Sequence, residues 1–155
     1  MNYMMTILSK RWAFDTNVLV YFLDKDSPFH ESAVKIFEHV ERDGIKVLIC
    51  QQNILELVQS MTKDYGLTLA RAVKVVKRLV QQDVLIVRPF DDTIDTYFNL
   101  CGNYSGSAKK HFDLYLAATL LDNGVDTLVT ADDSGFKSVS RLKCLGWEDF
   151  ENRRD

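Results

Sequence analysis

The chain has 155 residues, which is long enough to bury one hydrophobic core and short for two, so we expect a single domain over residues 1–155. Hydrophobic residues make up 46% and charged residues 26%, which excludes the disordered and fibrous classes. The net charge of −3 argues against a protein that coats nucleic acid through Lys and Arg, but it permits a metal-dependent nuclease, whose acidic residues bind the cations that face the phosphate.

No targeting or membrane segment is expected. The first eight residues, MNYMMTIL, are too short for a signal-peptide core, and no other stretch approaches the roughly 18 apolar residues of a membrane span. Cys50, Cys101 and Cys144 are an odd number of cysteines at wide spacing, which fits neither a disulfide framework nor a zinc knuckle. We therefore expect a protein of the reducing cytoplasm.

Short apolar runs alternate with helical patterns along the chain. The predicted strands cover residues 11–14, 46–50, 84–87 and 127–129, with a weaker strand near 142–144. Ser27 and Pro28 are typical of a helix start, and the periodic stretch 29–43 is expected to end at Gly44. Further helices are predicted near residues 53–63, 68–82, 92–103 and 110–123. This alternation predicts an α/β fold, with a mostly parallel central sheet of about five strands and helices on both faces.

Four acidic residues are predicted to lie at one edge of this sheet. Open parallel sheets bind ligands beyond the carboxyl ends of their strands, where the following helices begin. Asp15 ends the first strand, Glu56 lies near the start of the helix after the second, and Asp132 follows the strand 127–129. Asp113 lies near the start of the helix that leads back into that strand, so it falls on the same edge.

Asp113 is the most informative of the four, because helical periodicity places it in an apolar stripe. The flanking residues on that face are Phe112, Leu116, Ala117, Leu120 and Leu121. A buried carboxylate without a partner is costly, so we expect Asp113 to bind a metal ion, to be protonated or to form a buried salt bridge, for example with an arginine elsewhere in the chain. The sequence favours the functional and the structural explanation about equally.

Asp15 and Glu56 each have an ordinary explanation. Asp15 precedes an apolar run over residues 18–23, so it can cap a helix, a role worth about 1 kcal/mol, and still offer oxygen to a cation. Thr16 and Asn17 are then placed to orient it. Glu56 lies opposite the core stripe of its helix, so a solvated helix face explains it.

Asp132 and Asp133 lie in the segment VTADDSGF, a polar loop after a predicted buried strand. Loops at that edge often carry function, but Asp, Ser and Gly also form common turns. Thr130, at the strand end, is placed to hydrogen-bond a carboxylate or a metal-bound water.

Two groups of basic residues accompany the acids. Lys109 and Lys110 adjoin the predicted pocket, and we expect them to contact a substrate phosphate. The helix 68–82 carries a basic stripe that is more often a solvated face than an RNA track, and its members are Arg71, Lys74, Lys77 and Arg78. The three histidines are too scattered for a zinc site.

Three segments in order, FDTNVLVYF, CQQNILELV and HFDLYLAATLLDNGVDTLVTADDSGF, resemble the PIN-domain nucleases, especially the VapC-like toxins. The resemblance covers nearly the whole chain. The acidic positions of the family's motifs fall on Asp15, Glu56, Asp113 and Asp132. The chain departs from the family's pattern at Cys50, where the family often has Ser, and at Gly135, where it often has an acidic residue. Asp133 is the alternative fourth ligand.

The resemblance implies a divalent-metal-dependent endoribonuclease that is the toxin of a toxin–antitoxin pair. Its cofactor would be Mg²⁺ or Mn²⁺, hard cations that prefer oxygen ligands, bound by Asp15, Asp113 and Asp132, with Glu56 direct or through water. Such ions make a nucleophile of a bound water, and the products would carry 5′-phosphate and 3′-hydroxyl ends. An antitoxin peptide and a homodimer are also implied.

Two other functions remain open at this stage. Asp24 and Asp26 resemble the D-x-D motif of haloacid-dehalogenase phosphatases, but Pro28 replaces the Thr or Val expected there. A catalytically silent PIN-like binding module is the non-enzymatic alternative, against which the presence of all four acids argues.

Overall fold

The computed structural model describes residues 10–151 and contains one five-stranded sheet. Its strands are β1 (Arg11–Phe14), β2 (Lys46–Cys50), β3 (Val84–Val87), β4 (Thr127–Val129) and β5 (Lys143–Leu145). They pair in the order β3-β2-β1-β4-β5, and every pair is parallel. The predicted α/β fold is confirmed, with β5 one residue later than expected. The single domain over 1–155 stays a prediction.

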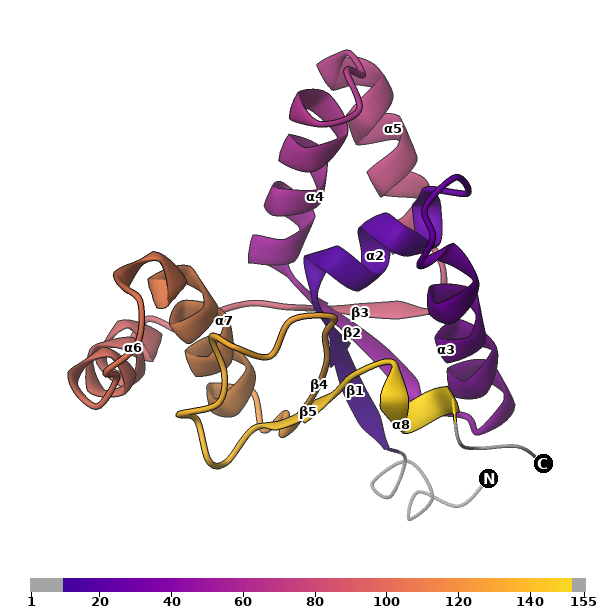
Figure 1. Ribbon diagram of the computed structural model, residues 1–155. Helices are drawn as coiled ribbons and strands as arrows, with labels where there is room; N and C mark the ends of the chain where they lie inside the picture. Colours follow the sequence, from indigo (N-terminus) through magenta and orange to yellow (C-terminus); the bar gives the residue numbers. More distant parts are fainter. Residues whose placement is uncertain (1–9, 152–155) are drawn as a thin grey trace, which may run out of the picture.

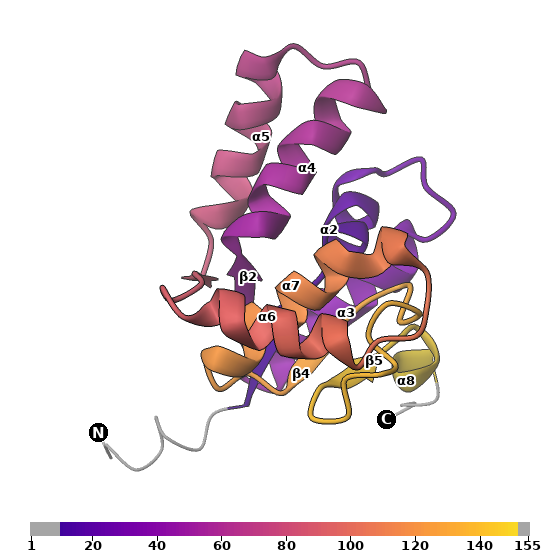
Figure 2. The same cartoon turned by 90° about the vertical axis from the view of Figure 1, so that its left-hand side faces the viewer.

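Helices cover both faces of the sheet (Figure 1). On one side lie α2 (Thr16–Leu23) and α3 (His30–Arg42), and on the other lie α6 (Thr93–Gly102) and α7 (His111–Asp122). The helices α4 (Gln51–Lys63) and α5 (Leu69–Val80) form a hairpin that projects from the sheet, as Figure 2 shows. A 3₁₀ turn, η1 (Ala108–Lys110), leads into α7, and a short helix, α8 (Glu148–Glu151), follows β5. None of the helices between residues 10 and 151 is long and apolar enough to cross a membrane.

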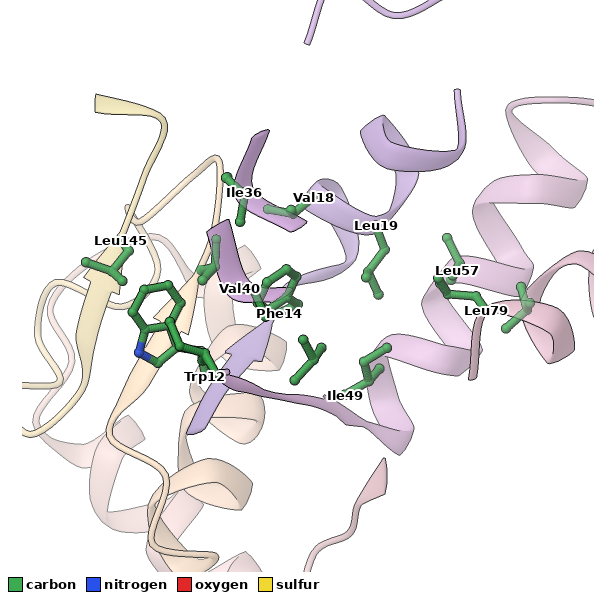
Figure 3. Packing of buried hydrophobic residues seen from close by; sticks show 14 of the residues in the cluster. Trp12, Phe14, Val18, Leu19, Ile36, Val40, Ile49, Leu57, Leu79 and Leu145 are labelled. Carbon is green, nitrogen blue, oxygen red and sulfur yellow. The ribbon is translucent and has the colours of Figure 1, made fainter. Parts of the chain in front are cut away.

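The alternation of side chains along β1 explains why the sheet has a core on each face. Trp12 and Phe14 pack into the cluster formed with α2, α3 and α4 (Figure 3), whereas Ala13 between them packs against α7. Phe14 is fully buried, and a buried Phe side chain is worth roughly 1.5–3 kcal/mol. The residue that follows it in the chain, Asp15, is therefore held in place by both cores.

The ends of α3 show where local sequence signals succeed and fail. Gly44 follows the helix with φ +64, its N–H bonds the Glu41 carbonyl, and the N–H of Ile45 bonds the Val40 carbonyl, so the predicted end is right. The predicted start is wrong. Ser27 accepts hydrogen bonds from the backbone of Phe29 and His30, which makes a turn ahead of the helix instead of capping it.

Candidate active site

A pocket of about 370 Å³ opens where β1, β2 and β4 end. Asp15 follows β1, Glu56 lies on α4, Asp113 on α7 and Asp132 after β4, and all four line this pocket. The other residues of the lining are Thr16, Asn17, Val20, Tyr21, Ser60 and Lys110. The structure thus brings the four predicted acids to one hollow, although 117 positions of sequence separate the first from the last.

Asp15 is the buried member of the group, with 8% of its surface exposed. Its side chain caps α2 by accepting the N–H of Thr16 at 2.8 Å, and it accepts the Thr130 hydroxyl at 2.8 Å. Burial raises its pKa to about 6, with smaller contributions from Asp113 and Glu56, while the Thr130 and Thr16 hydrogen bonds oppose the rise. Within residues 10–151 no cationic side chain pairs with it.

Glu56 is held by a polar chain that the sequence did not reveal. The Thr16 hydroxyl donates to its Oε2 at 2.7 Å, and Gln52 Nε2 donates to its Oε1 at 2.9 Å. Buried Asn53 donates to Thr16 Oγ1 at 2.9 Å and, at 3.4 Å, to Asp15. The solvated face given as the ordinary explanation of Glu56 is therefore incomplete, because this face of α4 also lines the pocket.

Asp113 is half-buried, with 30% of its side chain exposed, rather than enclosed in an apolar stripe. Phe112, expected to flank it in the core, is 61% exposed. Burial raises the pKa of Asp113 and Lys110 opposes this, with Lys110 Nζ lying 3.9 Å from Asp113 Oδ2. A salt bridge was one of the three alternatives for Asp113, and the partner that the structure gives it is a lysine one turn away instead of a distant arginine. Gly135 packs directly on the Asp113 carboxylate.

Asp132 lies at the pocket mouth, with 56% of its side chain exposed. It accepts the backbone N–H of Ser134 at 3.0 Å and the ammonium of Lys110 at 3.0 Å. These contacts, the Ser134 hydrogen bonds foremost, lower its pKa to about 2. Asp133, the alternative ligand, lines a different hollow beside Phe136 and lies 3.9 Å from Lys137.

Asn17 and Thr130 tie α2 to the loop after β4. Asn17 Nδ2 donates to Thr130 Oγ1 at 3.3 Å, and its carbonyl oxygen accepts the N–H of Ala131 at 3.1 Å. Thr130 is 2% exposed and also accepts the N–H of Asp132 at 3.2 Å. One threonine thereby positions both Asp15 and Asp132.

The two predicted phosphate-binding lysines are placed differently. Lys110 lines the pocket, whereas Lys109 is exposed. Cys50, at a position where the resemblance often implies Ser, is buried, and burial foremost raises the pKa of its thiol to about 12, so it is a neutral residue beside the acids. The three cysteines are free.

The donor chemistry of the pocket suits a hard divalent cation, since it offers carboxylate oxygens and includes the buried Asp15 carboxylate, which pairs with no cation in the part of the chain that the structure describes. The carboxylates are not arranged around one common point, as the ligands of a bound ion would be. Within residues 10–151, no three Asp, Glu, His or Cys side chains are placed so that they could hold one ion together. Asp132 instead faces Lys110 and the Ser134 backbone.

The fold resembles several solved structures. VapBC2 from Rickettsia felis, bound to a DNA fragment from its promoter, has a TM-score of 0.65 at 19% identity, covering 88% of this chain and 98% of that one. VapBC-1 from nontypeable Haemophilus influenzae has a TM-score of 0.65 at 17% identity, covering 89% and 98%. VapC20 from Mycobacterium tuberculosis, a toxin that cleaves the sarcin–ricin loop, has a TM-score of 0.64 at 12% identity, covering 80% and 92%. At these identities the likeness shows the fold.

Comparison of the sequence with protein families shows more than the fold, because it identifies the family. No curated protein matches the chain. The model of the family described as PIN domain, however, matches residues 13–142, a span that runs from β1 through the loop after β4 and includes the four acids of the pocket. The chain therefore belongs to the PIN-domain family.

Proposed function

We propose that this protein is a divalent-metal-dependent endoribonuclease, the toxin of a toxin–antitoxin pair. One observation carries the proposal: the buried carboxylate of Asp15 shares an open pocket with Asp113 and Glu56, and among the described residues no cationic side chain pairs with Asp15 itself. Like charges held together in a low-dielectric site are costly in themselves, and a bound dication relieves that cost. Metal-dependent chemistry best explains why a PIN fold keeps these carboxylates together in its pocket despite the unfavourable free energy.

In this proposal Asp15, Asp113 and Asp132 hold Mg²⁺ or Mn²⁺, and Glu56 does so directly or through water. When bound, the metal supplies an activated water and absorbs the charge that develops on the phosphate. Thr130 and Thr16 fix the Asp15 oxygens through their hydrogen bonds, and Asn17 fixes Thr130. Lys110 offers a positive charge to the RNA phosphate at the pocket mouth.

The direct test uses purified protein and end-labelled structured and unstructured RNAs, with Mn²⁺ or with EDTA. We expect the RNA to be cleaved with Mn²⁺ and not with EDTA. We expect Asp113→Asn to lower the cleavage rate by roughly 100-fold or more, which is the loss typical of removing a group that stabilises the charge developing in the transition state. The far-UV circular dichroism of the variant should match that of the parent. A binding module would be indicated by RNA binding without cleavage, and a phosphatase by hydrolysis of a small phosphomonoester alone.

The identity of the fourth acidic ligand follows from a pair of neighbouring variants. Asp132 lines the pocket and Asp133 does not belong to its lining, so we expect Asp132→Asn to reduce cleavage far more than Asp133→Asn. A larger loss in Asp133→Asn would transfer the role to that residue.

The toxin assignment draws on the similar structures, one of which is a toxin–antitoxin complex and another a toxin that cleaves the sarcin–ricin loop. For this chain we propose an antitoxin peptide partner, a homodimer and a cytoplasmic location. Induced expression should arrest growth of a bacterial host, and expression of Asp113→Asn should not. Light scattering after gel filtration gives the mass of the particle, and a monomeric mass would exclude the homodimer.

The D-x-D alternative loses support from the fold. The apolar run before Asp24 is helix α2, and Asp24 accepts hydrogen bonds from Tyr65 and from the backbone of Asp26. Both of its side-chain oxygens are thus engaged outside the acidic pocket.

A further inference from the structure

Lys110 is a lysine within the acidic pocket, and its ammonium group lies close to two of the four carboxylates. Its ammonium nitrogen lies 3.0 Å from Asp132 Oδ2 and 3.9 Å from Asp113 Oδ2. Among the described residues that line the pocket, it is the one that carries a positive charge. With 32% of its side chain exposed, it is partly withdrawn from water. A contact of this kind is stronger than one between fully exposed groups.

The backbone delivers Lys110 to this place. Ser107 caps the 3₁₀ turn η1 by accepting the N–H of Lys109, and the turn continues into α7. Lys110 then stands three residues before Asp113, a spacing that puts both side chains on the same side of the helix start. The loop after β4 brings Asp132 Oδ2 to 3.0 Å from the ammonium group.

This arrangement uses the oxygens that a metal ion would need. Lys110 Nζ donates a hydrogen bond to Asp132 Oδ2, and the Ser134 N–H donates one to Asp132 Oδ1. A divalent ion that binds between Asp113 and Asp132 would therefore meet an ammonium group already at its ligands. Two cations this close repel each other, so the ammonium group and the ion would compete for these oxygens.

We propose that Lys110 is a built-in counter-cation of the acidic pocket, which competes with the divalent ion for Asp132 and Asp113 and turns to the substrate phosphate once the ion is bound. This inference rests on the proposed metal-dependent function and deepens it. The lysine stem has four flexible carbons, so the ammonium group can swing out without moving the backbone. The same charge then serves two states of the site in turn.

The test is Mn²⁺ binding to the whole chain without RNA, measured from the electron paramagnetic resonance signal of free Mn²⁺. Lys110→Met keeps the apolar stem and removes the charge. We expect it to bind Mn²⁺ roughly 10-fold more tightly, the size that follows from losing one like-charge contact of about 1.4 kcal/mol. Lys110→Arg keeps the charge and should stay near the parent.

Lys137→Met is the matched control, because Lys137 is 72% exposed and pairs with Asp133 outside the pocket. It should leave Mn²⁺ affinity unchanged, and equal tightening in Lys137→Met and Lys110→Met would overturn the inference by showing a general charge effect. Unchanged or weaker binding by Lys110→Met would also overturn it. A weaker value would mean that Lys110 positions Asp132 for the ion.

A second readout separates the two roles of the charge. At saturating Mn²⁺, Lys110→Met should cleave RNA more slowly than the parent although it binds the metal better, because the phosphate contact is lost. Cleavage at the parent rate would overturn the phosphate part of the proposal. If the parent protein shows no Mn²⁺ binding that Asp113→Asn removes, the proposed function itself fails. If the parent binds Mn²⁺ and Lys110→Met binds it equally, only the role of Lys110 fails.

Discussion

Asp15 determines how the site responds to pH. Its pKa is raised from 3.8 to about 6, chiefly by burial, so the folded protein holds this proton more tightly than the unfolded chain does. Ionisation of Asp15 therefore destabilises the fold. The cost is absent below about pH 4, grows between about pH 4 and 6 and is constant above, where it amounts to roughly 3 kcal/mol.

Asp15→Asn should remove this cost. In EDTA at pH 7 we expect the variant to have a higher free energy of unfolding than the parent, by about 1–3 kcal/mol, since an amide also loses part of the hydrogen bonding to Thr130. Urea unfolding at pH 4, 5, 6 and 7 measures the difference, which should shrink toward pH 4. Asp91→Asn, at an exposed position, is the control. Curves that stay parallel for parent and variant would show that Asp15 is not the titrating group.

Gly135 lies directly against Asp113 and leaves no room for a side chain at a position where the family often has an acidic residue. A Cβ at position 135 would lie 2.8 Å from both Cβ and Cγ of Asp113, closer than van der Waals contact allows. A side chain at 135 would therefore displace either the loop after β4 or the carboxylate.

Gly135→Ala should cost roughly 1–3 kcal/mol of stability, as overpacking usually does, and should also reduce cleavage by moving Asp113. Urea unfolding and the RNA cleavage assay measure the two effects on the same protein. Gly102→Ala is a suitable comparison, because nothing lies within 4 Å of the position of its added Cβ. Parent-like cleavage by Gly135→Ala would mean that Asp113 does not depend on this contact.

At the scale of single elements, the sequence predicts correctly those features that depend on residues close together in the chain. The four stronger strands and the glycine that ends α3 depend on local patterning and on backbone φ, and they were predicted correctly. The start of α3 was predicted wrongly, because the Ser27 hydroxyl has two competing uses of similar energy, a cap or a turn. The capping role expected for Asp15 is confirmed at the start of α2, although no bounds were predicted for that helix, and α8 was not predicted.

Two glycines test this local reasoning in opposite directions. Gly44 has φ +64 at the end of α3, so Gly44→Ala should cost about 1 kcal/mol of stability. Gly102 is the last residue of α6 and has open space around it, so Gly102→Ala should instead stabilise by roughly 0.4–1 kcal/mol through the unfolded state. Urea midpoints give both values. Shifts of the same sign would refute the conformational argument for Gly44.

The contacts within the site lie beyond such local reasoning. The edge of the sheet could be predicted for all four acids, because strand and helix direction fix it. The hydrogen bond from Thr16 to Glu56 joins residues 40 positions apart, and the one from Asn17 to Thr130 joins residues 113 apart. These pairs form only when helices and loops from distant parts of the chain pack together, so the pattern within one segment cannot predict them. Lys110 was expected at the pocket, but its ion pairs with Asp113 and Asp132 were not.

At the scale of the whole molecule, the order of the strands creates the site. β1 lies between β2 and β4, so the residues that follow these three strands meet at one edge (Figure 1). The pocket thus draws on helices from both layers, α2 and α4 on one side and α7 on the other. Anything that binds across it connects these layers, so metal binding should stabilise the whole fold.

The stabilisation by Mn²⁺ should depend on pH in a definite direction. At 100 times the dissociation constant a ligand stabilises by about 2.7 kcal/mol. Protons compete with the metal for Asp15, whose pKa is about 6, so at pH 5 about nine in ten molecules must release a proton to bind. Apparent affinity should fall roughly 10-fold, and the stabilisation at the same Mn²⁺ concentration should fall to about 1.4 kcal/mol. Thermal unfolding at pH 5 and 7.5, with Mn²⁺ and with EDTA, measures this change.

Two comparisons give this last prediction its force. Asp113→Asn should show little stabilisation by Mn²⁺ at either pH, because the pocket loses a carboxylate that faces Asp15. Lys110→Met should show more stabilisation than the parent at both, since the competing cation is gone. An increase in unfolding temperature that is equal at pH 5 and 7.5 in the parent would place the bound ion away from Asp15. The buried carboxylate would then be a structural feature of the α2 cap and not part of a metal site.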